Sequence, residues 1–444
     1  MNKLLLVLFT SFSISWWTPL PSTVLPNNDV YSVVTHQKVL CPPVDPQQGR
    51  LWSSEDSFDK ELTHPLENIE DISNFGNKKQ ILIDFAQNIA NDMDIGPIRL
   101  ITSHRNSGNL VYRVEDKSKN PVFYIKVMQK DQREFFDEIL GIHLLNTLKY
   151  CKLQGVEVLS VAKYVDKETK KTHVLIAESV APGKLIEDYV HEALKLKVGS
   201  EERKEAFFEI AKIMKIFGKA LADFHTKKQI SMQGLHPQYE KSFFELCQTV
   251  TNLLDKYPQK GLTSGDLWHL YQTHLTKLRT KKLAWSFTHG DSNFGNFFYD
   301  KETSEITTID LPTTKPSIGR GLQPIGNAAE DYTNIFDQLE LRRLIGLQKD
   351  EELLLGNAFG KGYQQSAFVV PSVEEIEFFQ FVCMLKRLLS TLGNLEAKAQ
   401  DAKKAGYVVR AETIEWLKQD KEASFAHLND KNHQVPACLL PSLF

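Results

Sequence analysis

The stretch that decides the fold runs from His289 to Asn296, with the sequence HGDSNFGN, and is followed by TTID at 307–310. Phosphoryl transfer needs a carboxylate that orients the attacking hydroxyl, and oxygen ligands that hold Mg²⁺ against the phosphates. His-x-Asp followed by four residues and Asn lets one loop present its acid toward a substrate and its amide toward a metal. We therefore predict that Asp291 is the catalytic base and that Asn296 and Asp310 bind the metal.

The residues after Asn296 predict a β-hairpin that brings a second acid back to this loop. Residues 297–299 (FFY) are typical of a strand, 300–303 (DKET) of a polar turn, and 306–309 (ITTI) of the returning strand. Asp310 follows that strand directly, so two groups would share one metal. An isolated His-Gly-Asp is more often only a turn. The matching Asn296 and Asp310 favour the catalytic loop instead.

This arrangement resembles the aminoglycoside phosphotransferase and choline kinase group of the protein-kinase-like superfamily, whose hallmark is His-Gly-Asp-x-x-x-x-Asn followed by Ile-Asp. The resemblance covers about residues 97–400 and depends on several segments in the correct order. It implies an α+β, bilobal protein-kinase-like fold, with an antiparallel-sheet N-lobe carrying one helix and a mainly helical C-lobe. It also implies ATP and Mg²⁺ as cofactors.

Two upstream segments resemble the nucleotide-binding elements of that group. Residues 123–128 (FYIKVM) resemble the strand that contacts the ATP phosphates, which implies Lys126 as a phosphate ligand. Residues 106–114 resemble the loop before it, where small residues let the backbone approach phosphate oxygens. The implied binding residues of this loop are Ser107, Gly108 and Asn109. A lone strand lysine is otherwise often an edge charge.

The segment after Lys126 has apolar residues three and four apart, which predicts an amphipathic helix. Its run 138–145 (EILGIHLL) resembles the helix of the group that carries the lysine's partner, which implies Glu138. Glu134, one turn earlier, is the alternative, and either acid could instead lie on a solvated helix face.

Residues 174–183 form an apolar strand that breaks into a Pro-Gly turn, and they resemble the hinge between the lobes. The resemblance places adenine against this segment, with Glu178 and Val180 as binding residues. Farther along, Asp331 resembles an acid that supports the catalytic loop through backbone hydrogen bonds. We interpret His225, at the end of a long helical stripe, as a cap or core contact.

Composition limits the possible partners and redox chemistry. The chain has 444 residues, of which 42% are hydrophobic and 25% charged, as in ordinary globular proteins. A formal net charge of -3 argues against nucleic-acid binding. Five widely spaced cysteines indicate neither a disulfide scaffold nor a zinc cluster.

The N-terminus predicts export. Residues 1–22 have a basic start and a short apolar run, which is typical of a signal peptide, although an N-terminal anchor is the alternative. The run is too short and too broken by proline for a good transmembrane span, so we expect no stable span after cleavage. A cytoplasmic location is expected if the leader is not a signal. The remaining segments are a loosely ordered leader at 23–76, an N-lobe at 77–180, a C-lobe at 181–430 and a tail at 431–444.

These features together predict an ATP-dependent phosphotransferase that phosphorylates a hydroxyl of a small molecule. The alternatives are an exported protein or peptide kinase and, from another class, a nucleotide-binding pseudokinase. Many relatives carry another acid two residues after the metal-binding acid, where this chain has Pro312. Nearby, Lys315 and Arg320 would either favour an anionic acceptor or belong to a surface loop.

Overall fold

The computed structural model describes residues 76–103, 110–128, 132–148, 151–165, 172–257, 263–319, 323–343 and 345–405. The predicted signal or anchor, the leader up to residue 75, the tail, the loop residues Ser107, Gly108 and Asn109, and Arg320 lie outside these ranges. So do the side chains of Glu134 and Lys315. Within the described ranges, none of the helices has the length and apolar character needed to cross a bilayer.

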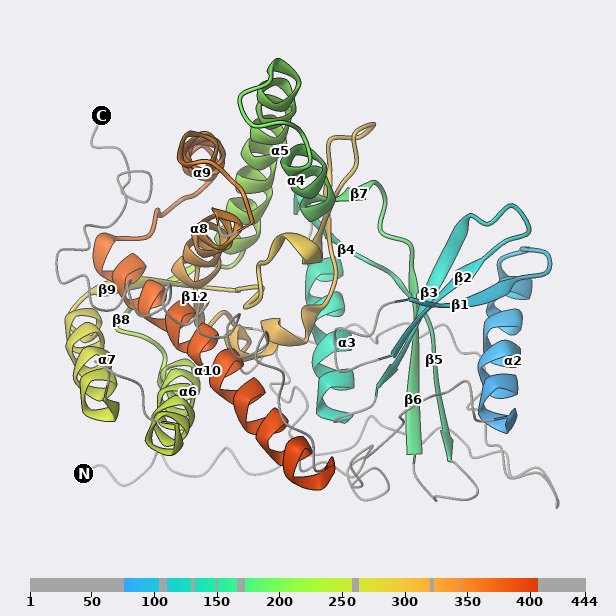
Figure 1. The fold of residues 1–444 in the computed structure, drawn as a ribbon, viewed down its shortest axis with the longest axis horizontal. Helices are drawn as coiled ribbons and strands as arrows, with labels where there is room; N and C mark the ends of the chain where they lie inside the picture. Colours follow the sequence, from blue (N-terminus) through green and yellow to red (C-terminus); the bar gives the residue numbers. More distant parts are fainter. Residues whose placement is uncertain are drawn as a thin grey trace, which may run out of the picture.

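The first sheet has five antiparallel strands in the order β1-β2-β3-β6-β5 (Figure 1). Their bounds are β1 Arg99–Ser103, β2 Leu110–Glu115, β3 Pro121–Met128, β5 Val158–Val165 and β6 Thr172–Ser179. β1 pairs with β2 and β5 pairs with β6, so an antiparallel hairpin lies at each end of the strand order. The antiparallel-sheet N-lobe is therefore confirmed.

Helices cover both faces of this sheet. Helix α2 (Gly76–Asp92) has apolar side chains at helical spacing, and Phe85 and Ile89 are buried with Phe123 and Ile125 of β3. Residues that alternate with these along the strands face the other way, toward Ile139 and its neighbours on α3 (Gln132–Thr147). The sheet thus lies between α2 and α3 (Figure 1).

The predicted catalytic hairpin forms the centre of a second sheet with the order β4-β11-β10-β7. The bounds are β4 Leu153–Gly155, β7 Lys184–Leu185, β10 Phe297–Tyr299 and β11 Ile306–Thr308. β4 pairs in parallel with β11, and β7 pairs antiparallel with β10. The hairpin is therefore held between a strand that follows α3 and a strand that follows the hinge.

Glycine at the hinge permits this pairing. Gly183 has a φ of 84°, and a Cβ there would lie 2.1 Å from the carbonyl oxygen of Tyr299. Only glycine fits both the left-handed backbone and the close approach. Just before it, the Ser179 N–H donates to the Glu157 carbonyl at 2.8 Å, and the Glu157 N–H donates to Ser179 Oγ at 2.9 Å. The hinge is thus fixed to β5 at one end and to β10 at the other.

The second lobe is mainly helical, as predicted. Its helices are α4 Ile186–Leu194, α5 Glu201–Thr226, α6 Pro237–Lys256, α7 Ser264–Arg279, α8 Ala329–Arg343, α9 Lys349–Gln364 and α10 Val373–Ala405. A third sheet, with the order β12-β9-β8, consists of β8 Ile230–Gln233, β9 Lys282–Ser286 and β12 Gly326–Asn327. One hydrophobic core gathers around α5 and α9, and another around α6, α7 and α10. Phe294 of the catalytic loop is buried in the first of these cores.

Helix α3 packs against the 3-10 helix η3 (Leu311–Ser317), which begins directly after Asp310. A Cβ at Gly141 would lie 2.6 Å from both Cβ and the carbonyl oxygen of Leu311, so the glycine sets this close approach. Leu144 and Leu145 are buried in the same core as Phe297 and α5. The lobe boundary at residue 180 stays a prediction, but α3 shares its core with the second lobe.

Replacing Gly141 with alanine should separate α3 from η3. Alanine is the better helix former, yet overpacking typically costs about 1–3 kcal/mol, so we expect a net loss in the free energy of unfolding. Gly393→Ala in α10 is the matched control, because nothing lies within 4 Å of its Cβ position and alanine should stabilise the helix there. Urea unfolding measures both, and equal gains for both variants would contradict the packing argument.

Candidate active site

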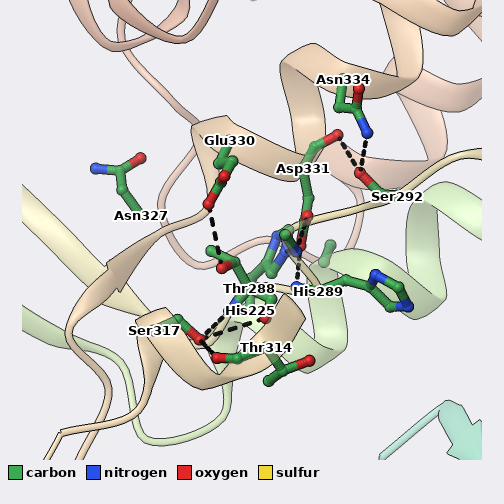
Figure 2. Close-up of polar contacts among 12 residues, drawn as sticks. His225, Thr288, His289, Ser292, Thr314, Ser317, Asn327, Glu330, Asp331 and Asn334 are labelled. Atoms are coloured by element: carbon green, nitrogen blue, oxygen red, sulfur yellow. Dashed lines mark hydrogen bonds and ion pairs between the residues drawn. The ribbon is translucent and has the colours of Figure 1, made fainter. Parts of the chain in front are cut away.

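One buried carboxylate fixes the backbone of the catalytic loop (Figure 2). Asp331, in the first turn of α8, accepts hydrogen bonds from the His289 N–H at 2.6 Å and from the Gly290 N–H at 2.8 Å. The Ser292 hydroxyl donates to the Asp331 carbonyl at 3.1 Å. The three residues around Asp291 are therefore bound to the start of one helix, as expected for Asp331.

His225 supports this carboxylate from α5. Its Nε2 lies 2.9 Å from Asp331 Oδ2, and its Nδ1 lies 2.8 Å from the Tyr363 hydroxyl. Burial alone would raise the pKa of Asp331, but hydrogen bonding and charge from His225 and His289 outweigh it and hold that pKa below its usual value. His225 is thus a buried contact within the core.

The ring of His289 joins the loop to the returning strand. Its Nδ1 lies 3.3 Å from the backbone nitrogen of Asp291. Nε2 lies 3.1 Å from the carbonyl oxygen of Ile309 and 2.9 Å from Thr308 Oγ1. The ring also packs on Phe297, with centroids 5.0 Å apart. Both its nitrogens therefore hold chain segments that carry predicted active-site acids.

The structure brings Asp291, Asn296 and Asp310 together. The Asn296 side-chain N–H donates to the carbonyl oxygen of Asp291 at 2.9 Å and to its carboxylate at 3.2 Å. The Asn296 carbonyl accepts the N–H of Ile309 at 3.0 Å, next to Asp310 in the chain. Asp310 has a φ of 61°, a left-handed conformation that is uncommon outside glycine and that here directs the chain from β11 into η3.

The oxygen atoms of these residues suit a cation whose remaining ligands come from a nucleotide and water. Within the described ranges, no three His, Cys, Asp or Glu side chains gather into a metal site. Mg²⁺ in phosphoryl-transfer enzymes needs only one or two protein ligands, because phosphate oxygens and water supply the rest. The amide nitrogen of Asn296 faces Asp291, so its amide oxygen is the atom that would face a metal. The Asp310 carboxylate stays the other predicted ligand.

A buried ion cluster in the N-lobe contains the predicted phosphate ligand. Lys126 Nζ lies 3.0 Å from Glu138 Oε1 and 3.2 Å from Glu178 Oε2, and all three side chains are buried. Burial alone would lower the pKa of Lys126, but the charges of Glu138, Glu178 and Asp310 outweigh it and raise that pKa. Lys126 is therefore a permanent cation, and the structure pairs it with Glu138 as the resemblance implied.

Glu138 also binds the C-lobe directly. Its Oε1 accepts the backbone N–H of Leu311 at 3.3 Å, immediately after Asp310. Burial and the charges of Glu178 and Asp310, opposed by Lys126, raise the pKa of Glu138 to about 7. A raised carboxyl pKa of this kind is typical of functional sites. The side chain of Glu138 thus joins Lys126 to the segment that follows Asp310.

The hinge residues occupy two different places. The side chain of Glu178 turns to Lys126, which sequence reasoning did not anticipate, and its Oε1 is buried without a hydrogen-bond partner among the described residues. Val180 is half-buried at the start of the hinge, directly after β6. The proximity of Val180 to adenine therefore stays a prediction.

A lysine from α10 also reaches the catalytic loop. Lys386 donates to the carbonyl oxygen of Gly290 at 3.0 Å and to Glu330 Oε1 at 2.8 Å. Glu330 in turn accepts a short hydrogen bond from the Tyr239 hydroxyl. The sequence predicted only packing for this helix, and no local motif marks a lysine 96 residues away in the chain.

The sequence matches no protein-family profile and no curated protein. Among solved structures, it is similar to an aminoglycoside-3'-phosphotransferase of type VIII, with 14% identity over 69% of this chain and 98% of that chain and a TM-score of 0.43. It is also similar to an ethanolamine kinase of Plasmodium vivax, with 14% identity, coverages of 85% and 96% and a TM-score of 0.44. A choline kinase of Cryptosporidium parvum has 12% identity, coverages of 82% and 98% and a TM-score of 0.42. These are the kinds of protein that the sequence motifs resemble.

Replacing Asp331 with asparagine should loosen the catalytic loop and lower stability by on the order of 3 kcal/mol at pH 7, because a buried, fully bonded charge is lost. A carboxyl whose folded pKa is depressed contributes stability above its unfolded pKa, and this contribution is lost as the pH falls through the folded value. The difference between wild type and variant should therefore shrink below about pH 4.

Urea unfolding between pH 7 and pH 3 tests this expectation. Asp188→Asn is the control, because Asp188 lies exposed on α4 and should leave the unfolding curve close to wild type at every pH. A difference for Asp331→Asn that stays constant with pH would contradict a charge-based role.

Proposed function

We propose that this protein is an ATP-dependent phosphotransferase that phosphorylates a hydroxyl group of a small molecule. One observation carries the proposal. The side chain of Asn296 bonds Asp291 while its backbone carbonyl bonds Ile309, so an acid for the hydroxyl and two oxygen ligands for a metal meet at one place. This is the set that phosphoryl transfer needs.

In the proposed mechanism, Asp291 orients the acceptor hydroxyl and takes its proton. Asn296 and Asp310 would hold Mg²⁺, which neutralises charge on the phosphates when it is bound. Lys126 would bind a phosphate oxygen of ATP. An ammonium has three N–H groups. Among the described residues Glu138 and Glu178 take two of them, which would leave one for the nucleotide. Positioning and charge neutralisation would then account for the rate acceleration, because the proposed reaction has no covalent intermediate on the protein.

The segment after Asp310 supports a compact acceptor. It folds into η3, then forms a bridge between Ile318 and Pro324, and returns to the third sheet through β12. Ser317 fixes η3 beneath the catalytic loop, because its hydroxyl accepts the Thr288 N–H at 2.9 Å. The described part of this segment therefore packs back on the C-lobe, where an extended peptide acceptor would need an open strand edge or groove.

Replacing Asp291 with asparagine should lower phosphate transfer by roughly 10²–10⁴-fold, because the general base is lost while the shape of the side chain is kept. ATP affinity should change little. ADP release measured over a library of hydroxyl metabolites, with calorimetry for ATP binding, gives both quantities. Asp300→Asn is the control, since Asp300 lies in the exposed turn of the same hairpin and bonds Glu302 and Thr303.

The same screen separates the proposal from its alternatives. Turnover with a small hydroxyl compound, lost in Asp291→Asn and kept in Asp300→Asn, supports the proposal. Turnover with peptides alone would instead favour a peptide kinase. ATP binding with no acceptor in either library would favour a pseudokinase.

A further inference from the structure

Lys386 brings a positive charge to the catalytic loop from the long C-terminal helix. Its ammonium bonds the carbonyl oxygen of Gly290, the residue directly before Asp291. The ion pair with Glu330 at 2.8 Å fixes its position. Lys386 lies on α10 and Glu330 lies on α8, so neither of these side chains belongs to the loop motif. The loop therefore has a cation that its own sequence does not encode.

The acid that holds Lys386 is itself held firmly. Glu330 is buried, and its second carboxylate oxygen accepts hydrogen bonds from the Tyr239 hydroxyl and, at 3.4 Å, from Thr288. Burial alone would lower the pKa of Lys386, but the charge and hydrogen bond of Glu330 and the charge of Asp291 outweigh it and raise that pKa. Lys386 is thus charged and lies within electrostatic reach of Asp291.

The ammonium of Lys386 still has bonding capacity. It carries three N–H groups, and in the described part of the chain Gly290 and Glu330 accept two of them. Its side chain is 39% exposed. Arg387, the next residue, is different, because its guanidinium bonds Asp337 at 3.1 Å and faces Glu340 on α8. Only the first of these neighbouring cations points to the catalytic loop.

We propose that Lys386 is a second phosphate-binding residue, which contacts the transferring phosphoryl group from the acceptor side. The inference rests on the proposed function. Asp291 would hold the hydroxyl that receives the phosphoryl group, so a cation on the preceding carbonyl lies beside the point of transfer. Lys126 approaches the nucleotide from the N-lobe, and Lys386 would neutralise charge from the C-lobe. A hydrogen-bond donor fixed at this point would stabilise the transition state most strongly, because negative charge develops there during transfer.

The group-transfer step balances without a proton from Lys386. The acceptor oxygen forms a bond to the terminal phosphorus of ATP, and the bond from that phosphorus to the bridging oxygen breaks. ADP leaves with the electron pair of the broken bond, and the hydroxyl proton passes to Asp291. Lys386 stays protonated and contributes only a charged hydrogen bond to a phosphoryl oxygen.

Binding of a phosphoryl mimic tests the inference without knowledge of the acceptor. Calorimetry would compare Mg·ADP with Mg·ADP plus aluminium fluoride, which imitates the transferring group. We expect Lys386→Met to bind Mg·ADP as wild type does, and to lose roughly 10²-fold of the extra affinity that fluoride adds. Arg387→Met is the matched control and should keep that extra affinity. Full fluoride-dependent affinity in Lys386→Met, or none in wild type, would overturn the inference.

A second pair of variants separates phosphate binding from simple neutralisation of Glu330. If Lys386 served only to balance that buried charge, the double variant Lys386→Met with Glu330→Gln would recover the fluoride-dependent affinity. We expect it to stay low, and we expect Lys386→Arg to restore part of it. Recovery in the double variant would overturn the inference alone. Failure of the wild type to bind Mg·ADP would instead overturn the proposed function and this inference with it.

Discussion

The active site depends on the hydrogen bonds between the Asp331 carboxylate and the backbone N–H groups of His289 and Gly290. A loop of this kind has no ladder partners of its own, so its buried N–H groups need a separate acceptor. Asp331 supplies one. It lies at the start of α8 and is held by His225, whose other ring nitrogen bonds the Tyr363 hydroxyl. The direction of Asp291, and the bond from Asn296 to it, follow from this fixed backbone.

Among the described residues, three carboxylates lie close to Lys126. Lys126 is one buried cation, and the charges of Glu138, Glu178 and Asp310 raise its pKa. Each of these acids is costly to bury unless a positive charge is near, and the raised pKa of Glu138 reflects that cost. A divalent cation, as proposed above, would offset part of this negative charge. One oxygen of Glu178 is buried without a hydrogen-bond partner among the described residues.

The parts of the site that could be predicted from the sequence are those set by short spacing. The hairpin from Phe297 to Thr308 and the triad of Asp291, Asn296 and Asp310 lie within 20 residues, so their geometry follows from the local chain. Lys126 and Glu138 are similarly close, one on a strand and the other on the next helix.

The contacts that the sequence did not predict join residues that lie far apart in the chain. Glu178 reaches Lys126 across paired strands, and Lys386 reaches Gly290 from a helix that local pattern assigns only to packing. For α3, the helical period predicted one apolar face, but the helix is buried against both the sheet and η3. Gly141, inside that helix, was the one local sign of a close neighbour.

The contact between Gly141 and Leu311 also limits how the two lobes can move. A cleft between lobes is usually pictured as opening at the hinge, here near Gly183. Because α3 lies against the backbone after Asp310 with no room for even a methyl group, the helix behaves mechanically as part of the lower lobe. Opening would then tilt the five-stranded sheet over a stationary α3, and the joint that slides would be the bond between Lys126 and Glu138. The ion pair between Lys126 and Glu138 therefore joins the five-stranded sheet to a helix that is held against the second lobe at Gly141.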